Sequence, residues 1–223
     1  MNFIVGNLSP LTVRGAPQTA GEKGKDMRTL VIGDSWASAV EADTRRDAGW
    51  PEIIGIEMGL RQGIAGSTAA QWAADASGVL TRATNTVADA VIVSLLGNDA
   101  RAAVSDGKVT AGEIAAGLRD MRAVVDAVQR PLTIVLLYAD PFCGEQVQAR
   151  VAVPLLNGAI RWACNGLPVV YADTGAWLTR EHFDGRDIHP TRAGHVVIAQ
   201  NMRELIEANA QAHRRQKPQK GNV

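Results

Sequence analysis

Ser35 is the first residue whose type and position could do chemistry. It lies in the stretch LVIGDSWASAV, residues 30–40, just after an apolar run that stops at Gly33 and Asp34. A serine hydroxyl is a weak nucleophile and needs a base within hydrogen-bond reach. Gly33 permits a tight turn before Ser35. The N–H of a serine at the next helix start lies where the helix dipole favours an oxyanion. Ala37 excludes a GxSxG elbow, and taken alone Ser35 is more simply explained as a helix N-cap.

A candidate base lies near the other end of the chain, in FDGRDIHPTRAGH, residues 183–195. Pro190 disfavours a helical conformation for His189, so the preceding residues are expected to be extended. In an extended chain residues two apart point to the same side, and Asp187 can therefore orient the His189 imidazole or stabilise its charged form. Pro190 then starts the last helix. The remaining histidines have no such setting and are expected to be structural or solvated: His182, His195 and His213.

Two further positions offer hydrogen-bond donors for an oxyanion. Gly66, in GIAGSTAAQW, precedes a predicted helix and would present a free backbone N–H. Asn98, in LLGNDA, follows a predicted strand and carries a side-chain amide. Each of them alone is only a turn signal. Beside the Ser35 N–H they would complete a set of donors for a tetrahedral intermediate.

The elements that must position these residues alternate along the chain. The runs RTLVIGD, ADAVIVSLLGND, PLTIVLLYADP and LPVVYADTG predict strands of a parallel sheet covered on both faces. EMGLRQGIAG predicts a less regular strand that ends in Gly66. Repeated strand–helix–strand units predict a three-layer α/β/α, flavodoxin-like fold with a central, mainly parallel five-stranded sheet. Sites in such folds lie beyond the carboxyl ends of the strands, where Ser35, Gly66 and Asn98 all fall.

Helices are predicted at residues 68–82, 110–129, 147–164 and 191–209. The clearest begins TAGEIAAGLRD, where Thr110 and Glu113 have the spacing of a capping box. Its apolar residues follow the i, i+3, i+4, i+7 spacing of a buried stripe. The predicted stripe consists of Ile114, Leu118, Met121, Val124, Val125 and Val128.

Composition excludes several kinds of partner. The 223 residues carry 23 basic and 23 acidic side chains, so neither nucleic acid nor an anionic membrane is expected as the main partner. No apolar run reaches the roughly 18 residues that span a bilayer. Because residues 1–26 lack the features of a secretory signal, a cytoplasmic location is the default expectation, with export by another route left open.

We expect one folded domain over residues 27–209, between a flexible leader at 1–26 and a basic, flexible tail at 210–223. Cys143 and Cys164 lack metal-binding spacing, so no zinc site is expected. The default for them is two reduced thiols, and a bridge in an oxidising compartment is the alternative.

The order of four blocks carries more information than any one block. GDS follows the first strand, a glycine the second and GND the third, and D-x-H-P comes late. This set resembles the SGNH (GDSL) hydrolase family, from Met27 to about Leu205. The resemblance implies Ser35 as nucleophile, His189 as base, and Gly66 and Asn98 as oxyanion donors together with the Ser35 N–H. Trp36 replaces the eponymous leucine without changing the chemistry.

One position departs from the family pattern. The family usually places its acid three residues before the histidine, where this chain has Arg186. Arginine has only donors and cannot accept a hydrogen bond from imidazole. Asp187, two residues before His189, is the preferred substitute, and Asp184, five residues before, is the alternative. A Ser–His dyad, with a backbone carbonyl holding the imidazole, is also open.

The resemblance implies a carboxylic ester hydrolase that works through an acyl-enzyme and needs no metal or organic cofactor. Short loops without an apolar lid argue against a long-chain lipase. We therefore expect hydrolysis of short-chain, mainly acetyl, esters of small molecules or carbohydrates. Trp36 and Trp72 could stack on a sugar ring, although core packing is the more frequent role of tryptophan. The alternatives are a non-catalytic flavodoxin-like binding module, or an acyltransferase or thioesterase that uses the same site.

Overall fold

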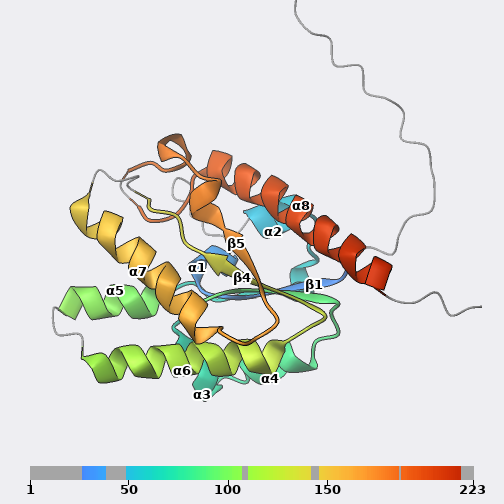
Figure 1. Ribbon diagram of the computed structural model, residues 1–223, viewed down its shortest axis with the longest axis horizontal. Helices are drawn as coiled ribbons and strands as arrows, with labels where there is room; N and C mark the ends of the chain where they lie inside the picture. Colours follow the sequence, from blue (N-terminus) through green and yellow to red (C-terminus); the bar gives the residue numbers. More distant parts are fainter. Residues whose placement is uncertain (1–26, 39–48, 107–109, 142–145, 186, 217–223) are drawn as a thin grey trace, which may run out of the picture.

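A five-stranded parallel sheet forms the centre of the molecule (Figure 1). The computed structural model describes residues 27–38, 49–106, 110–141, 146–185 and 187–216, so the predicted leader, Cys143 and Arg186 lie outside the described residues. The strand order β2-β1-β3-β4-β5, with every neighbouring pair parallel, confirms the predicted fold class. The strands are β1 (Thr29–Gly33), β2 (Arg61–Gly63), β3 (Ala90–Ser94), β4 (Leu132–Leu137) and β5 (Val170–Asp173).

Helices cover both faces of the sheet, which is why β1, β3 and β4 are buried at every position. α2 (Trp50–Ile53) packs on α8 (Arg192–Gln216) above the sheet in Figure 1. The opposite face is covered by α3 (Ala69–Ala74), α4 (Val79–Asn85), α6 (Ala111–Val128) and α7 (Val147–Ala163). The remaining short elements are α1 (Ser35–Ser38), α5 (Gly97–Asp106), and the 3-10 segments η1 (Met58–Leu60), η2 (Thr174–Ala176) and η3 (Arg180–His182). None of the described helices is long and apolar enough to cross a membrane.

α6 begins and ends where the sequence predicts. Thr110 is its N-cap, and both hydrogen bonds of the capping box with Glu113 are present. Four residues of the predicted stripe, Met121, Val124, Val125 and Val128, are fully buried. Ile114 is 51 % exposed, and Leu118 is only half-buried. The prediction that Ile114 is buried was wrong, because the first turns of α6 border an open groove rather than the core.

The single helix predicted over residues 68–82 is two helices. α3 ends at Asp75, which has a φ of 49°, and α4 begins after Gly78, which has a φ of 67°. The Asp75 carboxylate accepts hydrogen bonds from the N–H groups of Leu80 and Thr81 at 2.7 and 3.1 Å. Aspartate often accepts such bonds from nearby backbone amides at helix starts. Asp75 and Gly78 therefore specify a turn that separates two helices where the periodicity predicted one.

Two other predicted boundaries differ from the observed ones. β2 ends at Gly63, not Gly66, because the chain turns at residues 64–67 with the Ser67 N–H donating to the Ile64 carbonyl. α8 continues past Asn209 to Gln216, into the part predicted to be a flexible tail. Alanine, glutamine and arginine favour a helix there, and the first breaker in the sequence is Pro218.

The turn out of β1 depends on a glycine. Gly33 has a φ of 130°, and a Cβ built there would overlap the carbonyl oxygen of Ser94 on β3. The Asp34 N–H donates to that same carbonyl at 2.8 Å. Only glycine combines this backbone angle with so close an approach. β1 therefore ends against β3 in a fixed geometry that determines where the next residues lie.

We predict that Gly33→Ala destabilises the fold by roughly 2–6 kcal/mol, because backbone strain and overpacking act together. Denaturant unfolding measures this, with Gly158→Ala in α7 as the matched control. A Cβ at Gly158 meets nothing within 4 Å, and the change from glycine to alanine inside a helix is expected to add about 1 kcal/mol of stability. Equal midpoints for the two variants would contradict the prediction.

Candidate active site

Ser35 is the first residue of α1 and lies directly beyond the carboxyl end of β1. The Asp34 N–H donates to the Ser94 carbonyl, and the amides of residues 36–38 all donate to oxygens of Asp34. Of the five amides in this turn, that of Ser35 is the one without a hydrogen-bond partner among the described residues. An unpaired N–H beside a serine hydroxyl is what a developing oxyanion requires.

The Asp34 carboxylate is buried beneath this turn. Its Oδ1 accepts hydrogen bonds from the Trp36 N–H and the Ser94 hydroxyl, each at 3.0 Å, and its Oδ2 accepts one from the Tyr138 hydroxyl at 2.5 Å. Burial raises the pKa of Asp34 to about 6, although these donors act in the opposite direction. Burial, and then the neighbouring Asp34 charge, hold the pKa of Tyr138 well above its usual value.

The functional relevance of Asp34 and Tyr138 was not predicted from the sequence. The sequence feature that could have pointed to Asp34 is its position, because an acidic residue stands there between the glycine that ends a strand and the candidate nucleophile. Tyr138 is the first residue after β4, and Ser35 is the second residue after β1. A polar group just beyond the carboxyl end of a parallel strand is well placed for a functional site.

The loop that carries Gly66 is tied to the end of β1. The Ile64 N–H and the Ser67 hydroxyl both donate to the Gly33 carbonyl, at 2.8 and 3.1 Å. The Trp72 indole N–H in turn donates to Ser67 Oγ at 2.9 Å. Gly66 itself is exposed with a φ of 80°, and its N–H has no partner among the described residues. The predicted donor is therefore available and held near the Ser35 turn.

Asn98 lies in the first turn of α5, just beyond β3. Its side-chain Nδ2 donates one hydrogen bond to the Ser67 carbonyl at 3.0 Å, and an amide nitrogen has a second hydrogen to give. The preceding Leu96 has a φ of 85°, which is strained for a residue other than glycine. The bonds from Gly33 to Ser67 and from Ser67 to Asn98 bring the three predicted oxyanion blocks together.

His189 and Asp187 form the pair predicted from the D-x-H-P block. Asp187 Oδ1 lies 2.7 Å from His189 Nδ1 and accepts the His189 backbone N–H at 3.3 Å. Asp184 is not placed beside the imidazole by any of these bonds, and its Oδ1 accepts the Asp187 N–H at 3.0 Å. Asp187 thus occupies the position of an imidazole-orienting acid, while Asp184 supports the loop that holds it.

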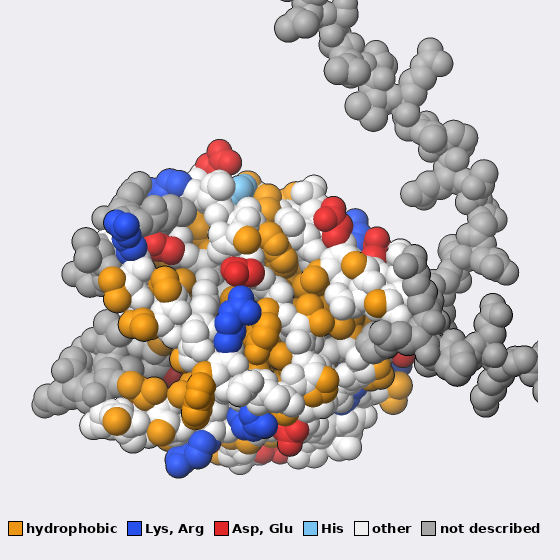
Figure 2. Space-filling model, viewed as in Figure 1, with side chains coloured by type: hydrophobic (Ala, Val, Ile, Leu, Met, Phe, Trp, Pro, Cys, Tyr) orange, Lys and Arg blue, Asp and Glu red, His pale blue; other side chains and the backbone are white. Residues whose placement is uncertain are grey.

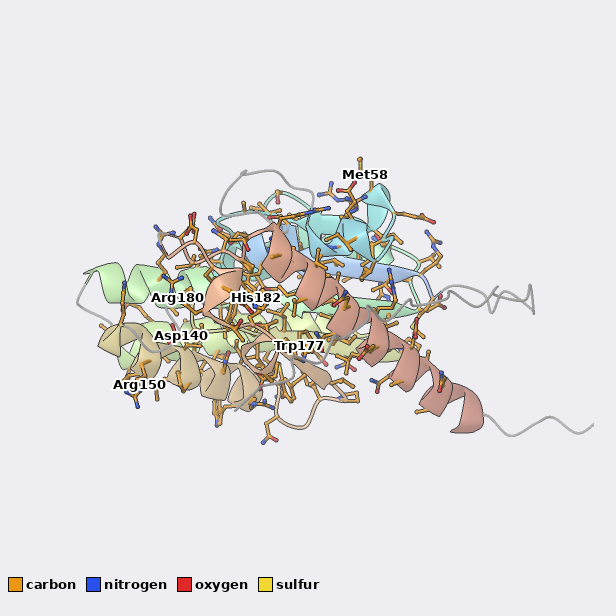
Figure 3. All side chains as sticks on the ribbon, turned by 90° about the horizontal axis from the view of Figure 1, so that it is seen from above. Met58, Asp140, Arg150, Trp177, Arg180 and His182 are labelled. Atoms are coloured by element: carbon orange, nitrogen blue, oxygen red, sulfur yellow. The ribbon has the colours of Figure 1, made fainter. Side chains whose placement is uncertain are left out.

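The loop containing this pair is closed at its base. Phe183 and Pro190 form an antiparallel bridge, and the Thr191 N–H donates to the His182 carbonyl at 2.9 Å. Figure 3 places the labelled His182 and Arg180 on the same side of the molecule as α5, which follows β3. The segment after β5 therefore reaches the edge of the sheet where β3 ends (Figures 1 and 3).

The two halves of the site are not joined by a hydrogen bond among the described residues. His189 Nε2, the nitrogen that does not face Asp187, is buried and has no partner. The Ser35 hydroxyl likewise makes no hydrogen bond to the described part of the chain. Bonds between a catalytic base and its nucleophile often form only when substrate binds. Each group therefore has its reactive atom unengaged.

Other predictions for this region fare differently. The idea that Trp36 and Trp72 stack on a sugar was wrong, because they are 4 % and 1 % exposed and pack beneath the site. Cys164 is a buried free thiol whose pKa burial raises to about 11. Within the described ranges, no group of three or more His, Cys, Asp or Glu side chains is arranged to hold a metal ion.

Comparison with known structures supports the same fold. The acetylxylan esterase Axe2 from Geobacillus stearothermophilus is 17 % identical with a TM-score of 0.61, and the match covers 81 % of this chain and 94 % of that one. The lipase Lip_vut3 from a goat rumen metagenome is 15 % identical with a TM-score of 0.60, covering 80 % and 96 %. Three further Axe2 structures are of catalytic mutants in which an aspartate, a histidine or a serine is replaced by alanine. None of the curated proteins matches this sequence.

The sequence itself matches the GDSL-like Lipase/Acylhydrolase family over residues 31–197, a span that includes every block of the site described above. This chain therefore belongs to the GDSL-like lipase/acylhydrolase (SGNH) family and is a carboxylic ester hydrolase.

Proposed function

We propose that this protein hydrolyses short-chain acyl esters, acetyl esters above all, with Ser35 as nucleophile and His189 as general base. The Asp187–His189 pair is the observation that carries the proposal. A carboxylate 2.7 Å from Nδ1 holds the proton on that nitrogen, so Nε2 is left as the basic atom. That atom is buried and has no hydrogen-bond partner in the described part of the chain, as a base waiting for a hydroxyl proton would be.

The reaction follows from the groups in place. His189 Nε2 takes the Ser35 proton as Oγ attacks the ester carbonyl, and Asp187 stabilises the imidazolium. The Ser35 N–H, the Gly66 N–H and the second amide hydrogen of Asn98 bind the oxyanion. His189 returns the proton to the leaving alcohol, and water then hydrolyses the acyl-enzyme with His189 again as base.

Two considerations favour a small acyl group on a carbohydrate. In the described part of the chain, the connections from β1 to α1, from β2 to α3 and from β3 to α5 are short and include no apolar insertion of the size of a lid. The structural neighbours include one acetylxylan esterase, Axe2, both as the unmutated enzyme and as mutants. Acetylated xylan and acetylated amino sugars are therefore the first natural substrates to test, although the buried Trp36 and Trp72 do not supply a stacking surface.

We predict that Ser35→Ala lowers hydrolysis of p-nitrophenyl acetate by roughly 10⁴-fold or more, since the nucleophile is removed. Ser77→Ala, at an exposed serine, is the matched control and should keep wild-type turnover. A fluorophosphonate probe should label the wild type at Ser35 and leave Ser35→Ala unlabelled. A wild-type protein that neither turns over esters nor reacts with the probe would instead be a binding module. Transfer of the acyl group to an added alcohol in place of water would indicate an acyltransferase.

We predict that Asp187→Asn lowers kcat by up to about 10⁴-fold, because an amide can hold the imidazole in the wrong tautomer. Asp184→Asn is the matched control. An asparagine keeps the oxygen that accepts the Asp187 N–H, so its kcat should change less than tenfold. A larger loss for Asp184→Asn than for Asp187→Asn would assign the acid to Asp184, and a small loss in both would favour a Ser–His dyad.

A second candidate function, hydrolysis of longer acyl esters, is favoured by one feature. A groove of about 380 Å³ lies between α5, α6 and α7 and is lined mostly by apolar side chains. Figure 2 shows hydrophobic side chains gathered over these helices, and Ile114 and Leu155 at the groove are 51 % and 68 % exposed. Leu96 and Asp99, which flank Asn98 in the chain, line its inner wall. An acyl chain bound at Asn98 would therefore find an apolar groove beside it.

Gly117→Leu tests this second candidate by filling the groove. A Cβ at Gly117 makes only ordinary contact, with the Leu96 side chain at 3.5 Å, so the variant should fold. If the groove binds acyl chains, p-nitrophenyl octanoate hydrolysis falls at least tenfold while acetate hydrolysis is unchanged. Gly112→Leu, on the same helix but outside the groove, is the control. Equal effects of Gly117→Leu on both esters would exclude the groove as an acyl site.

A further inference from the structure

One phenol hydroxyl lies between two parts of the proposed oxyanion hole. Tyr138 follows β4 and is buried. Its Oη donates to Asp34 Oδ2 at 2.5 Å and accepts the Gly97 N–H at 3.3 Å. Ser94 Oγ lies 3.2 Å from the same oxygen. The hydroxyl is thus bonded on one side to the residue before Ser35 and on the other to the residue before Asn98.

On the first side, Tyr138 acts through Asp34. The Asp34 carboxylate accepts the Trp36 N–H, and among the described residues the Ser35 N–H is the one amide of residues 34–38 without a partner. The Trp36 ring packs edge-on against the Tyr138 ring, with centroids 5.4 Å apart and an interplanar angle of 80°. The Trp50 indole N–H holds the Trp36 carbonyl at 2.9 Å. The turn is therefore held by backbone, carboxylate and ring contacts that meet at Tyr138.

On the second side, Tyr138 contacts the start of α5. A Cβ at Gly97 would come within 3.0 Å of Tyr138 Cζ and 3.1 Å of Asp34 Oδ2, so the helix start lies directly against the phenol and the carboxylate. The strained Leu96 immediately before it directs the chain into this contact. The position of Asn98, one residue further on, depends on that close approach.

We propose that Tyr138 and Asp34 are positioning residues that keep the distance between the Ser35 N–H and the Asn98 side-chain amide constant. The inference rests on the proposed esterase function and adds to it two residues that touch neither substrate nor the reacting atoms. Their role is to hold donors from β1 and β3 in register through a hydroxyl supplied by β4. Preorganised donors lose much of their effect when they are displaced by about 1 Å.

The network also makes the site sensitive to pH. The titratable groups that act on Asp34 are Tyr138 and, from α5, Asp99. An ionised Asp34 accepts three hydrogen bonds, and a protonated one must give up an acceptor position. The Tyr138 hydroxyl is the strongest influence lowering the pKa of Asp34. Its removal therefore raises the pKa of Asp34 above about 6, so the ionised form requires a higher pH.

The test compares Tyr138→Phe with Tyr171→Phe, the same change at the other tyrosine of the chain, whose hydroxyl donates to the Arg161 carbonyl on the surface. For Tyr138→Phe we expect kcat for p-nitrophenyl acetate to fall 10- to 100-fold with KM changed less than threefold. A misplacement of about 1 Å can lower the rate by roughly 10²-fold. The acid limb of its kcat–pH profile should move to higher pH. Tyr171→Phe should leave kcat and the profile unchanged.

Amide hydrogen exchange gives a second readout that needs no turnover. Tyr138→Phe should speed exchange in residues 34–38 and 97–100 together, while α6 keeps its wild-type rates. If Tyr138→Phe does not fold, Asp34→Asn takes its place, because an amide keeps an acceptor for the Trp36 N–H but presents a donor to Tyr138. An active wild type with unchanged kcat, pH profile and exchange in the variant would overturn the positioning role. A wild type without esterase activity would overturn the proposed function, and exchange alone would then decide the positioning.

Discussion

The burial of the Asp34 carboxylate at the end of β1 determines the geometry of the Ser35 turn and of the strand ends around it. Asp34 occupies the space between three neighbouring strands, and its two oxygens take donors from its own turn, from Ser94 and from Tyr138. Such a group is costly to bury unless it is fully hydrogen-bonded. Here it is satisfied only if β1, β3 and β4 end in one arrangement. The requirement to satisfy Asp34 therefore also specifies where the Ser35 hydroxyl and N–H lie.

The loops that carry Gly66 and Asn98 are attached to this point by hydrogen bonds that backbone carbonyls accept. The Gly33 carbonyl accepts two donors from the 64–67 loop, and Asn98 donates to the Ser67 carbonyl. Backbone groups at the carboxyl edge of a parallel sheet have no further strand partner, so they are free to bind loops. The left-handed Leu96 is the strained residue in this arrangement. Such strain persists only where the surroundings determine the conformation.

Much of this could be predicted from the sequence, and the failures have specific causes. Continuous apolar runs gave the strands correctly, because a sheet covered on both faces buries every position. The break at Asp75 and Gly78 was missed because the spacing of apolar residues does not by itself reveal a turn between two short helices that cover the same face of the sheet. Ile114 was assigned to the core because periodicity describes a face of α6 but not how far the sheet beneath it extends. Asp34 and Tyr138 are far apart in sequence, so their contact follows only from the strand order.

The aspartate that pairs with His189 stands one position closer to the histidine than the family pattern leads one to expect. Asp187 stands two residues before His189. Its Oδ1 accepts a hydrogen bond from the His189 backbone N–H and lies within hydrogen-bond distance of His189 Nδ1. A short aspartate side chain readily bonds the backbone two residues on, so this local turn supplies the carboxylate position by itself. Asp184 then bonds the Asp187 N–H and keeps that turn in place. The orientation of the imidazole thus depends on a local pattern of aspartates rather than on a fixed spacing, and the proposed Ser–His–Asp mechanism does not require an acid at position 186.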